Sequence, residues 1–325
     1  MPRQTPGPVK RAPLAIILLV LAAVAAAWLL IRGNPPAATG TRLSSRPIPA
    51  ELADAFSGER AYGHVRSILA FGPRPPASKG YENTLRFLES ELAKLGWITL
   101  RQSFQLGTPR GPLTFTNLLA RYGKERPDWT QSVPTIIGGH LDSKLVDDFT
   151  FLGANDGASS TGVILEIARV LAADPKAAES IELVFFDGEE AFLPNITPTD
   201  GLYGSKYYAH TISKRHSWPA MGIVLDLVGD AAHSFFYNSE TPANFATAIQ
   251  KSASLHGLEL RPSPGPILDD HVPLQNTGLP CLHLIGDFMN MPYWHQPGDT
   301  LEVIEPQALE KTGRSTLRFL AEVAP

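Results

Sequence analysis

The sequence predicts an α/β domain built as a three-layer sandwich, in which helices flank a mostly parallel, twisted central sheet. Two observations predict this fold. Short apolar segments rich in β-branched and aromatic residues alternate with segments whose apolar residues recur at helical spacing. Several of the apolar segments also end in Asp, Glu or His, and the carboxyl ends of parallel strands are where α/β proteins bind ligands.

The first 31 residues predict a membrane anchor outside this domain. Residues 12–31 carry no charge, and a helix of this length rises about 30 Å, the thickness of the hydrocarbon core. The basic tail 1–11 places the N-terminus in the cytoplasm and the rest of the chain on the periplasmic, extracellular or lumenal side. A cleaved signal peptide, which gives a secreted form, is the alternative. Residues 32–49 are rich in Pro, Gly and Ala and predict a linker to a single domain at 50–325.

The composition limits the classes of function. The net charge of the 325 residues is −4 and no basic run stands out, so nothing indicates nucleic-acid binding. One cysteine, Cys281, excludes an intrachain disulfide and a cysteine-based zinc site. Because Cys281 lies in the apolar run LPCLHLI, we expect a buried structural thiol and not a nucleophile. Any metal in this chain must therefore be bound by His, Asp and Glu.

Periodicity and turn residues place the elements along the domain. Tyr81 to Leu95 has the clearest amphipathic pattern, and Gly96 is placed to end it. Helices are expected at 51–70, 81–95, around 163–171, within 201–212, at 242–255 and at 306–323. Strands are expected at 98–106, 115–122, 134–138, 181–186, 222–227, 233–237 and 279–285. The strands 98–106 and 115–122 predict an antiparallel pair at a sheet edge.

The stretch SIELVFFDGEEAF, residues 180–192, carries the strongest chemical signal. It begins as a strand and ends with Asp187, Glu189 and Glu190. Three carboxylates within four residues repel one another, so a metal ion or a substrate amine is expected beside them. Our hypothesis is that one glutamate is a catalytic base and the other a metal ligand. A solvated acidic turn is the alternative, and Asp187 could simply brace the turn.

Four further residues fall at predicted strand ends or in loops. His140 follows two glycines after a strand, and Asp156 precedes a helix, where it could simply cap the N-terminus. Asp226 lies inside the apolar strand GIVLDL, which is costly unless the carboxylate is paired or binds a metal. His295 lies in a loop. Together with Glu190 these histidines and carboxylates suit a zinc site with an open position, with Glu189 beside it for proton transfer.

Five motifs in this order resemble those of the zinc-dependent exopeptidases of peptidase family 28: GGHLDS, GANDGASS, FFDGEEAF, a strand with DLVG, and WHQPGDT. The resemblance runs from about Phe71 to the C-terminus. Within this group the chain is most similar to the glutaminyl cyclases, through HLDSK, DGEEAF followed by LYGS, and DDHVPL ahead of LPCLHLI. It implies that Asp156, Glu190 and His295 bind a catalytic zinc ion and that Glu189 is the proton shuttle.

The resemblance also implies roles for other residues. His140 and Asp226 match the second-metal ligands of two-zinc aminopeptidases, so one Zn²⁺ is expected and a second is possible. In the cyclases Asp226 instead joins a catalytic hydrogen-bond network, and Asp269 matches its partner. His283 and Trp294 match residues of the substrate pocket.

The implied function is a zinc-dependent cyclotransferase that converts N-terminal glutamine of peptides or proteins to pyroglutamate and releases ammonia. The first alternative is a zinc aminopeptidase that hydrolyses the N-terminal residue. The second is a membrane-anchored binding module that keeps the fold, but an idle site has no physical reason to keep so many carboxylates together.

Overall fold

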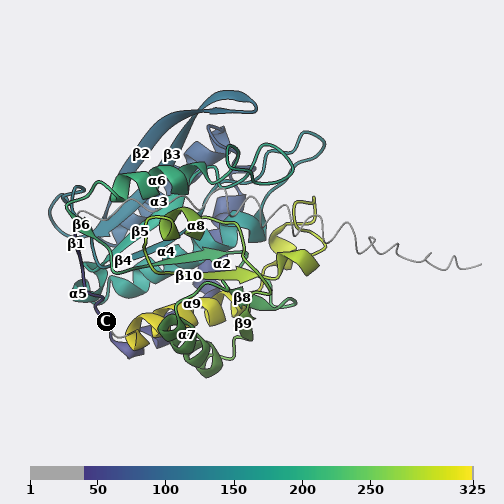
Figure 1. Ribbon diagram of the computed structural model, residues 1–325. Helices are drawn as coiled ribbons and strands as arrows, with labels where there is room; N and C mark the ends of the chain where they lie inside the picture. Colours follow the sequence, from purple (N-terminus) through teal and green to yellow (C-terminus); the bar gives the residue numbers. More distant parts are fainter. Residues whose placement is uncertain (1–39, 324–325) are drawn as a thin grey trace, which may run out of the picture.

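The computed structural model describes residues 40–323, and its centre is an eight-stranded mixed sheet in the order β2-β3-β5-β4-β7-β10-β8-β9 (Figure 1). The four middle strands are parallel, and antiparallel neighbours join on both sides. The strands are β2 Trp97–Thr108, β3 Gly111–Tyr122, β4 Thr135–His140, β5 Ile181–Phe186, β7 Met221–Asp226, β8 Phe235–Tyr237, β9 Leu260–Pro262 and β10 Cys281–Gly286. The predicted fold class is confirmed.

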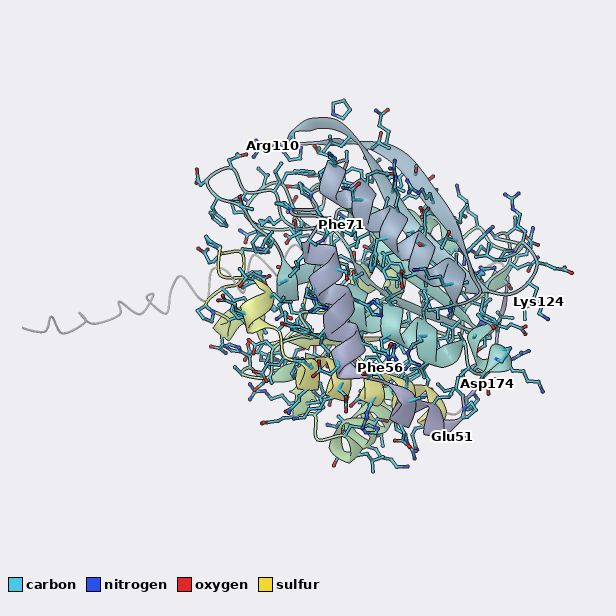
Figure 2. All side chains as sticks on the ribbon, turned by 180° about the vertical axis from the view of Figure 1, so that it is seen from behind. Glu51, Phe56, Phe71, Arg110, Lys124 and Asp174 are labelled. Carbon is cyan, nitrogen blue, oxygen red and sulfur yellow. The ribbon has the colours of Figure 1, made fainter. Side chains whose placement is uncertain are left out.

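Helices cover both faces of this sheet. One face carries α2 Gly58–Leu69, α3 Lys79–Lys94, α4 Ser160–Leu171, α7 Ala243–Leu255 and α9 Pro306–Glu322. The other face carries α6 Tyr203–Ile212 and α8 His271–Gln275. Seen from behind, α2 crosses its face between Phe56 and Phe71 (Figure 2). The remaining short helices are η1 Ala50–Ala55, η2 Ala154–Ser159, α5 Pro175–Ala178, η3 Phe288–Asn290 and η4 Leu301–Val303.

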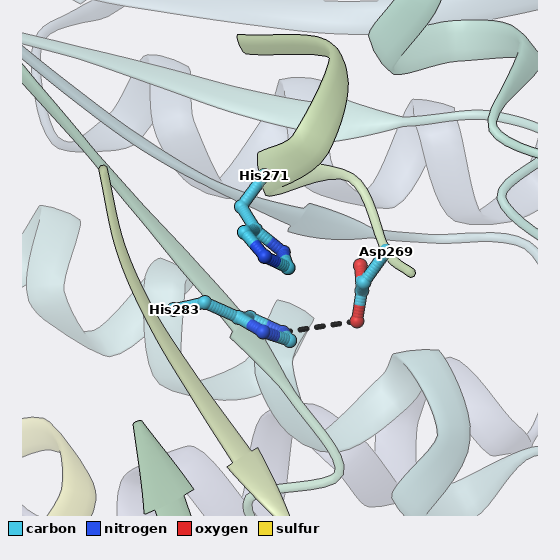
Figure 3. A group of neighbouring side chains, drawn as sticks. All are labelled: Asp269, His271 and His283. Atoms are coloured by element: carbon cyan, nitrogen blue, oxygen red, sulfur yellow. Dashed lines mark ion pairs between the residues drawn. The ribbon is translucent and has the colours of Figure 1, made fainter. Parts of the chain in front are cut away.

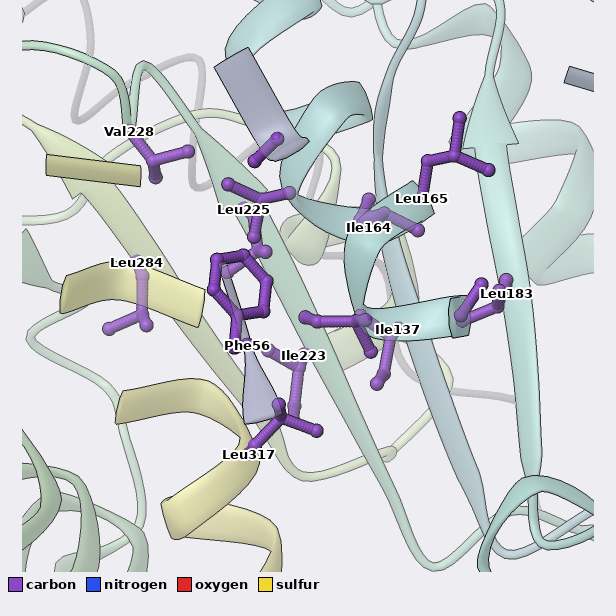
Figure 4. Packing of buried hydrophobic residues seen from close by; sticks show 14 of the residues in the cluster. Phe56, Ile137, Ile164, Leu165, Leu183, Ile223, Leu225, Val228, Leu284 and Leu317 are labelled. Carbon is purple, nitrogen blue, oxygen red and sulfur yellow. The ribbon is translucent and has the colours of Figure 1, made fainter. Parts of the chain in front are cut away.

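Because side chains alternate between the two faces along each strand, the sheet contributes to one hydrophobic core on each face. In β5, Leu183 and Phe185 pack under α4, whereas Val184 and Phe186 pack with Tyr208 of α6. The larger core also takes residues from the other parallel strands, among them Ile137, Ile223 and Leu284 (Figure 4). Strands β4, β5, β7 and β10 are buried along their whole length, as expected of parallel strands covered on both faces.

Most predicted elements are present, with one clear error among the helices. The antiparallel pair at the sheet edge is confirmed as β2 and β3, which form a long hairpin that projects from the domain. The single helix predicted at 51–70 is wrong: η1 ends at Ala55, and α2 begins at Gly58 after the extended Ser57. The Ser57 Oγ atom accepts a hydrogen bond from the Arg60 backbone N–H, which caps a new helix.

The N-terminal predictions fall largely outside the described residues. The tail 1–11, the apolar segment 12–31 and most of the linker precede residue 40. Within residues 40–323, no helix is long and apolar enough to cross a membrane. The described chain begins next to β1, Thr41–Arg42, which pairs with β6, Ser217–Trp218. Strand β6 leads into β7, so this start lies at the amino ends of the parallel strands. Cys281 is buried, as predicted.

Candidate metal centre

The candidate residues converge at the carboxyl ends of the parallel strands. His140 is the last residue of β4, Asp226 is the last residue of β7, and Glu189 and Glu190 follow β5 within four residues. Because these strands are parallel neighbours, their ends meet at one edge of the sheet. His140 Nε2 lies 3.0 Å from Asp226 Oδ1, although the two residues come from separate parts of the chain.

A glycine-flanked loop brings Asp156 to the same place. Gly153 and Gly157 have φ angles of +58° and +93°, and Asp156 between them is not helical. A side chain at Gly157 would put a Cβ atom 2.6 Å from the Asp142 carbonyl oxygen and 3.0 Å from the His140 ring. The loop therefore needs glycine to pass this close. Ser159, not Asp156, occupies the N-cap position of α4, so the capping explanation for Asp156 is wrong.

Asp156 is shared by two groups of candidate metal ligands. Its Oδ1 atom lies 3.1 Å from His140 Nε2, and its Oδ2 atom lies 3.3 Å from His295 Nε2. The inner group consists of His140, Asp156 and Asp226, and the outer group of Asp156, Glu190 and His295. In each group one ligand atom per residue lies within 4.8 Å of the others.

The outer group opens to solvent on the His295 side. The side chain of His295 is 21% exposed, whereas that of His140 is fully buried. His295 has a φ angle of +51°, an uncommon conformation for a residue with a side chain. Trp294 stacks on it at 4.3 Å between ring centroids, and Phe151 meets its edge at 6.0 Å. These rings hold the imidazole toward Glu190, whose Oε2 atom lies 3.3 Å from His295 Nε2.

Buried polar side chains hold this arrangement. The Asp142 carboxylate accepts the backbone N–H groups of Glu189 and Glu190, each at 3.2 Å, and so fixes the turn after β5. The Asp299 carboxylate accepts the N–H groups of Asn155 at 2.7 Å and Asp156 at 3.1 Å. Asp299 was missed by sequence reasoning, although it lies inside the motif QPGDT quoted above, and this position is the signal that could have found it.

The cationic support is Arg74, which is fully buried. Its guanidinium donates to the carbonyl oxygens of Leu141, Leu152 and Gly153 at 2.8–3.0 Å. These carbonyls belong to the segment between His140 and Asp156, so Arg74 ties the end of β4 to the glycine-flanked loop. Sequence reasoning missed this residue because it lies in a loop rich in Pro and Gly with no chemical motif of its own.

Asp187, the third carboxylate of the acidic turn, belongs to neither ligand group. Its Oδ2 atom accepts the backbone N–H of Thr116 in β3 at 2.7 Å. Its own N–H donates to the Asn117 side-chain oxygen at 3.0 Å. The residue therefore braces the turn against the neighbouring strand, which was one of the two explanations considered for it.

The electrostatics of the two groups differ. Burial would lower the pKa of His295, but Glu190 and Asp156 raise it to about 10. Burial and the Asp269 charge raise the pKa of Asp226 to about 7, although His140 opposes this shift. Burial would raise the pKa of Glu190, yet His295 and Lys144 lower it below the usual value. Without a metal ion, protonated His140 and His295 thus join Lys144 in supplying positive charge among these carboxylates.

The donor atoms fit a zinc ion. The buried Glu190 Oε1 atom has no hydrogen-bond partner within residues 40–323, and Asp156 Oδ2 meets the His295 ring at 3.3 Å. An imidazole and two carboxylates with a side open to solvent match the ligand chemistry of catalytic zinc sites. Glu189 belongs to neither group. Burial raises its pKa well above the usual value, and the charges of Asp269 and Glu190 add to this effect.

The remaining predicted residues lie beside this centre. Asp269 Oδ2 lies 2.9 Å from His283 Nε2, and both side chains are buried. His283 is in the middle of β10 and is fully buried, so its ring does not reach solvent in this structure. Trp294 is half-buried at the exposed side of His295, where a substrate would enter.

Comparisons with known proteins agree with this geometry. The model of peptidase family M28 matches residues 117–320. A mouse protein named glutaminyl-peptide cyclotransferase-like protein is 31% identical over 284 residues, covering 77% of this chain and 72% of the mouse protein. The structure of a glutaminyl cyclase from Porphyromonas gingivalis superposes with a TM-score of 0.73 at 28% identity and covers 83% of this chain and 99% of that one.

A Zn-dependent exopeptidase from Parabacteroides distasonis is as similar to this chain in fold as the Porphyromonas gingivalis enzyme is. Its structure superposes with a TM-score of 0.73 at 25% identity and covers 82% of this chain and 99% of that one. The family model spans more than half of the chain and includes every residue of the inner and outer groups. This chain belongs to peptidase family M28.

Proposed function

We propose that this chain is a zinc-dependent glutaminyl-peptide cyclotransferase, which converts N-terminal glutamine to pyroglutamate and releases ammonia. The observation that carries the choice within the family is Asp269. This buried carboxylate pairs with His283, and its charge raises the pKa of both Glu189 and Asp226. Its charge therefore acts on the two groups that would carry protons in the reaction. The names of the relatives support the same choice.

In this proposal Asp156, Glu190 and His295 would hold one Zn²⁺, which would polarise the side-chain carbonyl of the substrate glutamine. Glu189 takes a proton from the α-amine as the amine nitrogen bonds to the side-chain amide carbon. It then gives that proton to the amide nitrogen as the C–N bond breaks and ammonia leaves. A raised pKa suits both steps, because a proton carrier works best with a pKa near the working pH. A nearby zinc ion would bring the pKa of Glu189 down toward that range.

Asp226 and Asp269 would share the task of holding protons around the reacting amine. Asp226 has its pKa raised to about 7, whereas His283 outweighs the effect of burial and lowers the pKa of Asp269 to about 2. The two carboxylates thus divide into one that carries a proton near neutral pH and one that stays ionised. Because attacking and leaving nitrogens belong to one substrate residue, the positioning of that residue supplies much of the rate.

A zinc aminopeptidase is the second candidate function. The observation that favours it is that Asp156 belongs to both the inner and the outer group. The inner group is complete, so His140, Asp156 and Asp226 offer a second ion a full ligand set beside the first. Glu189 would then activate a water molecule that attacks the first peptide carbonyl. The similar exopeptidase structure adds weight to this candidate.

Mass spectrometry of products separates the two functions. A peptide that begins with Gln and a matched peptide that begins with Leu are incubated with the purified chain. We expect the first to lose the mass of ammonia and the second to stay intact, and removal of metal by a chelator to abolish the change. Loss of a whole residue from either peptide would overturn the cyclotransferase proposal in favour of the aminopeptidase.

We further propose that residues 12–31 anchor the domain on the non-cytoplasmic side of a membrane. The support is the uncharged segment and the basic residues before it. Since the described chain begins at the amino ends of the parallel strands, the metal centre at their carboxyl ends faces away from that start. Protease added to sealed membrane vesicles whose non-cytoplasmic face is outward should digest the domain, and a domain protected in those vesicles would contradict this location.

A further inference from the structure

A hydrogen-bonded network centred on Asp230 lies outside the residues that the proposed function uses. Asp230 follows β7 by four residues, and its buried carboxylate lies 2.7 Å from the ring of His233. Asp269 and His283 form a similar pair in the interior of the protein (Figure 3). The side chain of His233, in contrast, is 20% exposed. The Asp230 network therefore reaches from the surface into the buried part of the domain.

Tyr293 joins this network to the loop that carries Asp156. Its hydroxyl oxygen lies 2.5 Å from Asp230 Oδ2 and 3.0 Å from Asn155 Nδ2. Because a carboxylate only accepts hydrogen bonds, the hydroxyl donates to Asp230 and accepts from the Asn155 amide. The amide is oriented to do so, since its Oδ1 atom accepts the backbone N–H of Gly229 at 2.7 Å. Burial and the hydrogen bond to Asp230 raise the pKa of Tyr293, so the hydroxyl keeps its proton.

Asn155 is tied to the chain on both sides of His295. Tyr293 comes two residues before His295 and contacts the Asn155 side chain. Asp299 comes four residues after His295 and accepts the Asn155 backbone N–H. The φ angle of His295 is +51°, and a strained backbone of this kind persists only where its surroundings hold it. The two ties therefore fix the strained loop against the residue that precedes Asp156.

We propose that Tyr293, held by Asp230, is a positioning residue for the zinc ligands Asp156 and His295. It fixes the two ligand loops relative to each other before an ion arrives, so binding has less ordering to supply. The inference rests on the proposed function in one respect, that the outer group is the zinc site. It holds whether the substrate amine or a water molecule attacks.

Zinc affinity tests this role without any measurement of turnover. Tyr293→Phe removes the hydroxyl and keeps the ring in its cluster with Leu227 and Met291. We expect the affinity of the full chain for its first zinc ion to fall about tenfold, because losing a partner that orients metal ligands costs roughly 10–100-fold. Competition with a chromophoric chelator measures this affinity, and thermal unfolding of the metal-free chain measures stability.

Tyr237→Phe is the matched control. Tyr237 in β8 is 7% exposed and Tyr293 is 8% exposed, so the two rings are equally buried. The Tyr237 hydroxyl accepts a hydrogen bond from Gln250 of α7 at 3.1 Å, away from the ligand loops. Its removal should lower the Tm and leave zinc affinity unchanged. An equal loss of affinity in both variants would overturn the inference, because lowered stability would then explain it.

Asp230 supplies a second test, because it should act on the ligands only through Tyr293. Asp230→Ala should lower zinc affinity about as much as Tyr293→Phe does. The double variant should lose no more than either single variant, since both substitutions break the same chain of hydrogen bonds. Asp230→Asn should retain most of the affinity, because its amide oxygen can still accept from the hydroxyl.

The contrary results separate this inference from the proposed function. A folded Tyr293→Phe chain with wild-type zinc affinity overturns the inference alone. Losses that multiply in the double variant also overturn it, because Asp230 and Tyr293 would then act separately. A wild-type chain that binds no zinc overturns the proposed function together with the inference. If Tyr293→Phe does not fold, Asp230→Ala takes its place, and wild-type affinity of that variant is the contrary result.

Discussion

The inner and outer groups share Asp156, yet they are built in different ways. In the inner group, His140 and Asp226 end neighbouring parallel strands, so the register of the sheet holds both side chains in place. In the outer group, His295 lies on a loop with a left-handed backbone and has a partly exposed side chain. One group is part of the sheet edge, whereas the other is assembled from loops over it and faces the solvent.

This difference bears on which group an ion would occupy first. Glu190 has a lowered pKa and meets an arriving cation as a carboxylate. Asp226 has a pKa raised to about 7 and must give up a proton to bind the same cation near neutral pH. The exposed side of the outer group also leaves room for substrate. We therefore expect one ion, at the outer group, under conditions in which a cyclotransferase would act.

Replacing the proton carrier should have the largest effect. Glu189→Gln keeps the size of the side chain and removes its ability to exchange a proton, while both ligand groups stay complete. We expect turnover of a Gln-initiated peptide to fall by about 10²–10⁴-fold, the range typical of general acid–base groups, with zinc content unchanged. Steady-state kinetics and elemental analysis of one preparation measure both quantities.

The neighbouring glutamate is the matched control for this prediction. Glu190→Gln makes the same chemical exchange one residue later, within the outer group, and should lose zinc as well as turnover. Near-normal turnover of Glu189→Gln would contradict its role as the proton carrier. Equal loss of zinc from both variants would contradict the assignment of Glu190, and not Glu189, to the outer group.

Removing one histidine at a time should have the next largest effect. His295→Ala leaves the inner group intact, and His140→Ala leaves the outer group intact. We expect His295→Ala to weaken binding of the first zinc by at least about 100-fold, because loss of a direct ligand exceeds the 10–100-fold cost of losing a ligand's hydrogen-bond partner. His140→Ala should leave that affinity nearly unchanged. Competition with a chromophoric chelator measures both affinities.

The same pair of variants also tests the aminopeptidase alternative. A two-ion site would hold two zinc ions per wild-type chain, and either substitution would remove one of them. Two zinc ions per wild-type chain, together with equal losses of zinc affinity in the two variants, would contradict the expectation that the outer group binds zinc more tightly than the inner group. A folded His140→Ala chain that has lost its first ion would contradict it as well.

The different construction of the groups also explains what the sequence could predict. Glu190 and Asp226 follow or end apolar strands, so the local pattern placed both at one edge of the sheet. The supports of the site were not predictable in this way. Asp299 contacts Asn155 across 144 positions of the chain, and Arg74 contacts Leu141 across 67. No local period encodes contacts at such separations.

The break at Ser57 has a similar cause. The segment 51–70 carries apolar residues at helical spacing, but the Ser57 backbone N–H donates to Glu166 of α4 at 3.1 Å. Gly58 packs against α9 so closely that a Cβ atom would lie 1.9 Å from the Pro306 carbonyl oxygen. Tertiary packing therefore ends one helix and starts another within a segment whose own pattern favours one helix.

The smallest expected difference between the inner and outer groups is in how their zinc affinity depends on pH. At pH 6, well below the pKa of His295, an ion entering the outer group displaces about one proton, from that imidazole. An ion entering the inner group displaces one from His140 and a second from Asp226, which is protonated below about pH 7. Affinity for the inner group should therefore rise about tenfold more per pH unit up to that pH, and this extra dependence should vanish above it.

Calorimetry of zinc binding in buffers of different ionisation enthalpy counts these protons. The chain is stripped of metal, and His140→Ala reports on the outer group while His295→Ala reports on the inner one. We expect the inner group to release about one proton more than the outer group at pH 6 and the same number at pH 8. Equal release at both pH values would mean that Asp226 is already ionised. Protonation of Asp226 would then no longer disfavour a second zinc ion in the inner group.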